Sequence, residues 1–167
     1  MTKTLRIRSL LAAGAAALSL VGCGSDGLKV QGNVRLTVQQ SGQPAGSTAF
    51  EFPPDTVVDS VSGLGGVYGS CALVGSRYEI ELTRDGAGPD DFRAVRFSVP
   101  QRGAVGAAPS LTFTLGQSVY SGSGTCTASA SPDDDELSVT AQCTGLRSGS
   151  DPRVVEAAVN LVFTNCR

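Results

Sequence analysis

The sequence predicts an all-β protein, a single antiparallel β-sandwich-like domain of about eight to ten short strands with two disulfides. Short segments in which apolar and polar residues alternate recur along the chain, a period that is typical of strands with one buried face. Turn residues separate these segments, since the 167 residues include 21 glycines and 8 prolines. The length is that of one domain.

Residues 28–39 give the clearest strand pattern. Their apolar and polar residues alternate, which predicts one buried face and one solvated face. Gly32 interrupts the apolar side and indicates a β-bulge. The apolar side comprises Leu28, Val30, Val34, Leu36 and Val38, and the polar side Lys29, Gln31, Asn33, Arg35, Thr37 and Gln39.

Shorter elements are expected after this strand. SGQPAG at 41–46 predicts a turn, and FEF at 50–52 predicts a short strand. Pro53-Pro54 should end that strand, because proline donates no hydrogen bond to a ladder. Residues 56–61 predict another strand, which the glycines at 63–66 end.

The middle of the chain continues the period-2 pattern. Gly75-Ser76 predicts a turn, and DGAGPDD at 85–91 predicts a polar loop. One more short strand is expected to begin at Val119 and Tyr120, before the hairpin described next. The residues expected to face the core are Val67, Cys71, Leu73, Tyr78, Ile80, Leu82, Val95, Phe97, Val99, Leu111, Phe113 and Leu115.

Residues 124–130 and 137–143 flank the sequence SPDDDE and predict a β-hairpin. With Cys126 opposite Cys143, Pro132 falls opposite Leu137 at the end of a strand, where proline is tolerated. Cross-strand neighbours on one face are close enough for a disulfide.

The final segment, 154–164, is compatible with two structures. A strand would turn Val155, Ala157, Val159, Leu161 and Phe163 inward, whereas a helix would begin at Asp151-Pro152. Its many β-branched residues favour the strand.

The first 22 residues have the features of an export signal. Lys3, Arg6 and Arg8 precede an apolar run, Leu10 to Gly22, that is shorter than the roughly 20 residues of a membrane-spanning helix. Leu20-Val21-Gly22-Cys23 resembles the lipobox of bacterial lipoproteins. The resemblance is confined to residues 1–23. It implies cleavage before Cys23, diacylglycerol on its thiol, and a fatty acid such as palmitate on its new amine.

This resemblance divides the chain into a signal peptide at 1–22, a lipidated N-terminus and tether at 23–27, and a β domain at 28–167. The tether spans at most about 14 Å, so the domain is expected close to a membrane. Because Gly24, not Asp, follows Cys23, the resemblance implies the outer membrane if the source is Gram-negative. The alternative is an ordinary secretory signal.

Four cysteines remain after Cys23, and an exported protein is expected to oxidise them to two disulfides. The hairpin favours Cys126–Cys143, which leaves Cys71–Cys166, although four cysteines allow three connectivities. A four-cysteine zinc site is not expected because the sequence has no C-x₂-C pair.

Composition excludes several functions. The chain has no His and no Trp, so histidine-dependent catalysis and histidine-ligated metals are excluded. Three of the 13 basic residues lie before Cys23, so the 15 acidic residues dominate the rest of the chain. This charge argues against nucleic acid as a partner. No cofactor is expected apart from the lipid on Cys23.

Three acidic groups are weak candidates for chemistry. Asp133, Asp134, Asp135 and Glu136 at the hairpin tip offer oxygen ligands for Ca²⁺, as do Asp85, Asp90 and Asp91, but solvated acidic turns are the favoured explanation of both. Glu79 and Glu81 lie about 7 Å apart on one strand face, which would suit glycoside hydrolysis. An exposed strand face is the favoured explanation of this pair.

The sequence therefore favours a non-enzymatic, lipid-anchored β domain of the cell envelope. It would act by binding or structural contact with an envelope protein or surface ligand. A carboxylate-dependent hydrolase and a Ca²⁺-dependent adhesion module are the alternatives.

Overall fold

The computed structural model describes residues 27–40, 43–60, 66–88, 91–101, 108–122 and 125–166. The predicted signal peptide, Cys23, Asp90 and most of the glycine segment at 63–66 lie outside these residues. The described chain contains ten strands and no helix, which confirms the predicted fold class.

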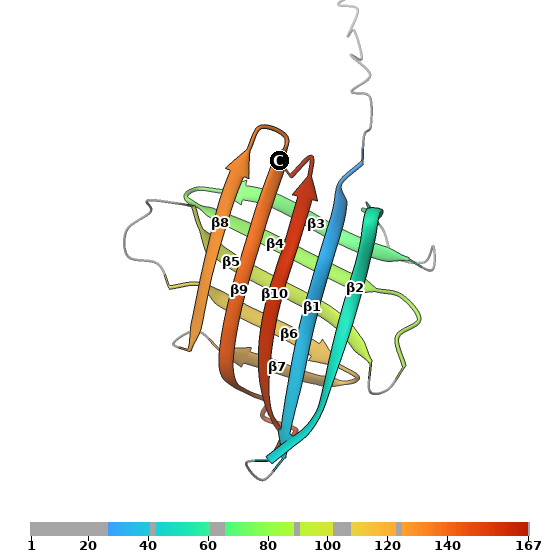
Figure 1. The fold of residues 1–167 in the computed structure, drawn as a ribbon, viewed down its shortest axis with the longest axis vertical. Helices are drawn as coiled ribbons and strands as arrows, with labels where there is room; N and C mark the ends of the chain where they lie inside the picture. The colour runs from blue at the N-terminus through green and yellow to red at the C-terminus, as the bar shows by residue number, and fades with distance from the viewer. Residues whose placement is uncertain are drawn as a thin grey trace, which may run out of the picture.

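The ten strands follow one another along the chain with short connections (Figure 1). Their bounds are β1 Lys29–Gln40, β2 Gln43–Asp59, β3 Val67–Val74, β4 Arg77–Arg84, β5 Phe92–Pro100, β6 Ser110–Leu115, β7 Ser118–Gly122, β8 Cys126–Asp133, β9 Glu136–Arg147 and β10 Val154–Thr164.

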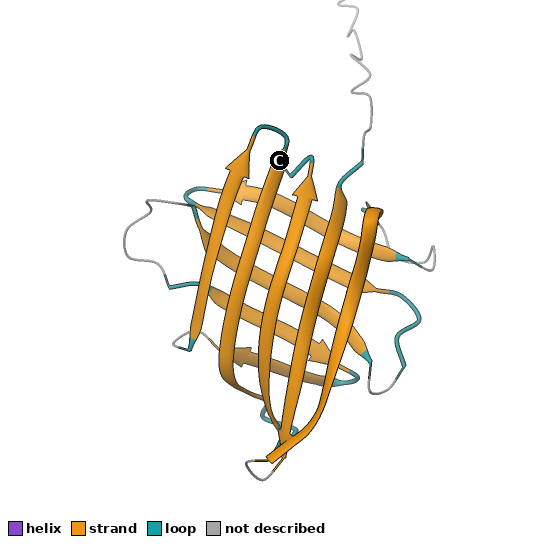
Figure 2. Cartoon of the chain, viewed as in Figure 1, coloured by secondary structure: helices purple, strands orange, loops and turns teal. Residues whose placement is uncertain are grey.

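The strands form two layers. In the order of pairing, β8, β9, β10, β1 and β2 make the front layer, and β3 to β7 make the back layer (Figure 2). The long front strands cross those at the back at a steep angle. At one corner β2 pairs in parallel with β3 through Val58 and Asp59, and at another Ser121 of β7 pairs with Arg147 of β9. The ladder is therefore continuous between the layers.

The core lies between the two layers and is apolar. Alternate residues of the strands point into it, including Leu36, Ile80, Phe97 and Leu161, each at most 1% exposed. The inward residues expected from the sequence are found there, except Leu73, which is 43% exposed near the β3–β4 turn. No polar or charged residue of the described chain is classed as buried.

The predicted interruption of β2 is wrong. One strand of 17 residues replaces the two expected short strands and residues 43–46 of the expected turn, of which residues 41 and 42 lie outside the described residues. Pro53, Pro54 and Asp55 have no partner in β1, because the ladder skips from Phe52 to Thr56. Asp55 adopts a φ of 63° at this bulge. The prolines are tolerated because they bulge out of the ladder instead of having to donate to it.

The predicted hairpin and the C-terminal strand are confirmed. Cys126 pairs with Cys143 and Pro132 with Leu137, in the expected register. Residues 154–164 form β10, which pairs with β9 on one side and β1 on the other. The helical alternative is therefore wrong. A strand in the middle of a layer, buried on one face, suits the β-branched residues of this segment.

Gly32 lies at the predicted bulge of β1, where the pairing with β2 shifts register between Val30 and Gly32. Its φ is 121°, and a Cβ atom built there would overlap the carbonyl oxygen of Asn160 in β10. Glycine is therefore required both by the backbone conformation and by the close approach of β10.

We expect Gly32→Ala to lower the free energy of unfolding by more than about 2 kcal/mol, because the methyl group meets backbone that cannot move aside. Urea denaturation of the purified protein measures the loss. Gly46→Ala is the matched control, since nothing lies within 4 Å of its Cβ position. Equal stability of the two variants would contradict the strain argument.

Candidate binding face and the other predicted sites

Two disulfides are formed, with the predicted connectivity. Cys71 of β3 is joined to Cys166, which follows β10, with their Cα atoms 4.9 Å apart. This bridge covalently links the back layer to the C-terminal end of the front layer. Cys126 is joined to Cys143 across the β8–β9 pair, with a Cα separation of 4.1 Å.

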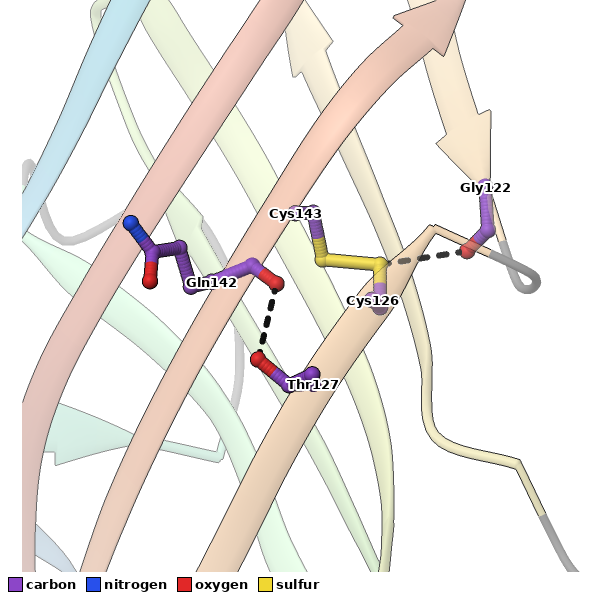
Figure 3. Close-up of a disulfide and its surroundings, with 5 residues drawn as sticks. All are labelled: Gly122, Cys126, Thr127, Gln142 and Cys143. Atoms are coloured by element: carbon purple, nitrogen blue, oxygen red, sulfur yellow. Dashed lines mark hydrogen bonds between the residues drawn. A yellow bond between two sulfur atoms is a disulfide. The ribbon is translucent and has the colours of Figure 1, made fainter.

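The second bridge fastens β8 to β9 at the start of β8 (Figure 3). Cys143 is completely buried, whereas Cys126 is half-buried. Next to the bridge, the Thr127 hydroxyl donates to the carbonyl oxygen of Gln142 at 3.4 Å. The sulfur of Cys126 lies 3.6 Å from the Gly122 carbonyl oxygen, a contact and not a hydrogen bond while the sulfur is in a disulfide.

The predicted acidic site at the hairpin tip is solvent-exposed. Asp133, Asp134, Asp135 and Glu136 all lie on the surface around the β8–β9 turn. In the second acidic loop, a carboxylate oxygen of Asp91 accepts from the Gly88 amide at 3.0 Å. Over the described residues, no three His, Cys, Asp or Glu side chains come together as a group that could hold a metal ion.

Glu79 and Glu81 lie on the outer face of the back layer, as predicted, but each has its own partner. Glu79 accepts from the Ser98 hydroxyl and lies 3.8 Å from Nε of Arg77. Glu81 accepts from Arg96 at 2.8 Å. The hollow beside Glu81 does not include Glu79 among its lining residues. The structure therefore does not direct the two carboxylates at a common point.

The outer face of the front layer, which we call the front face, is a polar surface formed by all five front strands. Because apolar and polar residues alternate along each strand, the polar side chains point outward. Polar side chains at paired positions therefore form rows that cross the strands. One row crosses all five strands through the ladder pairs. Its members are Glu51, Asn33, Asn160, Thr140 and Ser129.

Two shallow hollows lie next to each other on the front face. One, of about 480 Å³, spans β8, β9 and β10 and is lined by small and polar residues. The other, of about 400 Å³, lies at the β1–β2 bulge beside Pro53 and Pro54. Ala158 lines the first and Asn160 the second, two residues apart on β10.

Several polar groups of the front face have no partner within the described residues. Arg35 and Glu51 are charged and form no ion pair there, and the side-chain amides of Asn33 and Asn160 form no hydrogen bond there. Other groups of the front face are paired with each other, since the hydroxyls of Ser129 and Thr140 share a hydrogen bond at 2.8 Å and the Gln39 side chain donates to Glu156 at 2.8 Å. The four groups without a described partner are the donors and acceptors that the front face leaves available to a ligand.

Sequence reasoning identified the polar side of 28–39 but missed this face as a site. The available signal was the alternation itself, which marked residues 137–143 and 154–164 as half-solvated strands too. It did not show that these three segments lie side by side.

A second feature that sequence reasoning missed lies at the other end of the layers. Asp151 and Arg153, before β10, form an ion pair with a shortest contact of 2.6 Å. The hydroxyl of Tyr120 in β7 is buried beside the Asp151 carboxylate without reaching hydrogen-bond geometry. The Tyr120 ring stacks on Phe113 with centroids 5.2 Å apart. This cluster places the β9–β10 connection beside β7 of the back layer.

The cluster shifts the pKa of each of its groups. Burial, then the neighbouring Asp151 carboxylate, raises the pKa of Tyr120 to about 12. Hydrogen bonds from Arg153, and then the nearby Tyr120 hydroxyl dipole, hold the pKa of Asp151 well below its usual range, although that hydroxyl itself forms no hydrogen bond. The carboxylate in turn raises the pKa of Arg153.

Comparison with known proteins provides no family. No protein-family model, curated protein or solved structure matches this chain. No helix in the described part of the chain has the length and apolar character needed to cross a membrane.

Stability should fall as the pH rises from 9 to 11, because the unfolded chain releases the Tyr120 proton near pH 10 while the folded protein retains it. The contribution of Tyr120 is complete below pH 10 and is lost toward pH 12. We expect a loss of about 1 kcal/mol between pH 9 and 11, measured by urea denaturation.

In Tyr120→Phe, the loss of free energy of unfolding that Tyr120 causes between pH 9 and 11 should disappear. Tyr78→Phe removes another buried tyrosine, and this variant should still show the loss because Tyr120 is intact. An identical pH dependence in wild type and Tyr120→Phe would contradict the assignment.

Removing the two disulfides separately should have unequal effects. Cys71 and Cys166 are 95 residues apart, and Cys126 and Cys143 are 17 apart. Loop closure then predicts losses of about 4–5 kcal/mol for Cys71→Ser/Cys166→Ser and about 3 kcal/mol for Cys126→Ser/Cys143→Ser. Denaturation under non-reducing conditions measures both, and a larger loss for the hairpin pair would contradict the prediction.

Proposed function

We propose that the protein is a lipid-anchored domain of the cell envelope that acts by binding through its front face. The observation that carries this proposal is the set of unpaired polar groups there, Arg35, Glu51, Asn33 and Asn160, beside two hollows. Polar groups on a rigid sheet are held in place before a ligand arrives, which lowers the entropic cost of binding.

The proposed location is supported by the disulfides and by the sequence before Gly27. Disulfides persist in oxidising compartments such as the periplasm. Cys23 would carry diacylglycerol and a fatty acid after removal of residues 1–22. Several acyl chains on one residue give stable membrane attachment, whereas a single chain gives only marginal attachment. For a Gram-negative source, Gly24 supports the outer membrane.

The position of Gly27 supports one orientation of the domain toward the membrane. The Gly27 carbonyl accepts from the Asn165 side chain at 3.4 Å, and the Asn165 backbone amide donates to the Asp135 carbonyl at 3.0 Å. Gly27, the C-terminal end and the β8–β9 tip therefore share one end of the domain (Figure 1). The front strands would extend away from the membrane, and the front face would stay accessible.

Neither alternative function has support of this kind. Hydrolysis by two carboxylates requires both to approach one bond, and Glu79 and Glu81 are bound by separate partners. A calcium module requires several oxygen ligands around one point, and the tip carboxylates are not gathered in that way among the described residues. The geometry favours binding over both.

We expect Cys23→Ser to abolish fatty-acid labelling and to release the protein from membranes, because the thiol is the proposed acylation site. Metabolic labelling and membrane fractionation measure the two effects. Ser25→Ala is the matched control and should behave as wild type. A Cys23→Ser protein that stays in the membrane fraction would contradict the anchor.

Binding through the front face is tested in intact envelopes. A photoreactive side chain at position 158 on the front face should crosslink to an envelope component, and the same group at position 112 on the back layer should not. Equal yields from the two positions would contradict a specific role for the front face.

A further inference from the structure

We infer that the ligand of the front face is a neutral, β-linked glycan chain, an inference that rests on the proposed function. The juxtaposition that carries it is a surface of amides and hydroxyls on which the Arg35 guanidinium and the Glu51 carboxylate have no partner among the described residues, beside two adjoining hollows. Glycan hydroxyls both donate and accept, so they match a surface that offers both kinds of group.

The two hollows are lined by polar and apolar groups together, and Pro53, Pro54 and Val162 are among the apolar ones. The exposed large hydrophobic residues of the described chain are Val57, Leu73, Val74 and Val119, and none of them lines either hollow. A protein interface typically has an apolar centre with aromatic anchors, which these hollows lack on their exposed surface. A ligand that remains well hydrated and makes many hydrogen bonds suits this surface better.

The charges argue for a neutral ligand. Arg35 in β1 and Glu51 in β2 are close in the ladder, since Glu51 is opposite Asn33, and their opposite charges cancel locally. Binding of a polyanion requires a cluster of Lys and Arg, and neither hollow is lined by any basic residue. Lys29 and Glu156 lie on the same face and contact Asp55 and Gln39, so charges of both signs are mixed over the front face.

The shape argues for an extended chain. The two hollows adjoin across β10, where Ala158 and Asn160 are about 7 Å apart along the strand. A β-linked glycan is a flat ribbon that can lie across both. The exposed rings of Pro53 and Pro54 border the second hollow and offer an apolar surface to the C–H face of a sugar ring. The small side chain of Ala158 leaves room for the chain over β10.

The test is titration calorimetry on the full-length lipoprotein, purified from membranes in a detergent without a sugar headgroup. The probes are the β-linked hexamers of N-acetylglucosamine and of glucose, with hexagalacturonate as the anionic comparison. We expect at least one neutral hexamer to bind and to bind more tightly than hexagalacturonate. Absence of binding to both neutral hexamers at about 5 mM, or tighter binding of the anionic one, overturns the inference.

Two variants locate the binding. Asn160→Ala removes an amide and Ala158→Glu fills the first hollow, and each should weaken neutral-hexamer binding about tenfold, the effect of losing one or two hydrogen bonds. Thr112→Glu, which adds the same charge to the back layer, is the matched control for Ala158→Glu and should bind as wild type. Equal weakening in Thr112→Glu overturns the assignment to the front face.

The failure of this inference can be distinguished from failure of the proposed function. If no neutral hexamer binds, while the photoreactive group at position 158 still crosslinks specifically in the envelope, the front face binds something other than a neutral glycan. If that crosslink is also absent, binding through the front face is itself contradicted.

Discussion

The packing of the front layer on the back layer is the interaction on which the rest of this structure depends. Each layer alone would expose a row of apolar side chains to water, and their mutual burial provides the main driving force for folding. Leu36 and Leu161 in front and Ile80 and Phe97 behind are almost completely removed from solvent. Since every second residue is committed to this core, the groups available for function lie on outer faces, edges and loops.

Both outer faces carry pairs of polar residues that satisfy one another. On the back layer, Arg77, Glu79, Glu81 and Arg96 are engaged with neighbours on the same surface. Such exposed pairs add little stability. On the front layer, Arg35 and Glu51 are not paired with described residues. These two charges beside the hollows are the physical basis for proposing that the front face binds.

The two ends of the domain differ in what holds them together. At the end where the described chain begins, the Cys71–Cys166 bridge joins the C-terminal end to β3, and Asn165 contacts the β8–β9 hairpin. At the opposite end, β7 pairs with β9, and the Asp151–Arg153 ion pair lies within the β9–β10 connection. The covalent bridge and the ladder pairing therefore join the two layers, whereas the ion pair orders only the connection itself.

Local patterns in the sequence determined most of the strands, the inward residues and the Cys126–Cys143 disulfide, because period-2 alternation and the hairpin register are properties of short segments. The Cys71–Cys166 disulfide followed only by elimination, because it joins parts of the chain 95 residues apart. The continuity of β2 through Pro53 and Pro54 was decided by tertiary structure, since only a bulge against β1 lets the prolines avoid the ladder. Tertiary structure also decided which outward residues become neighbours. Asn33, Thr140 and Asn160 come from distant parts of the chain, and only sheet assembly places them in one row, because strand order depends on packing of the whole core.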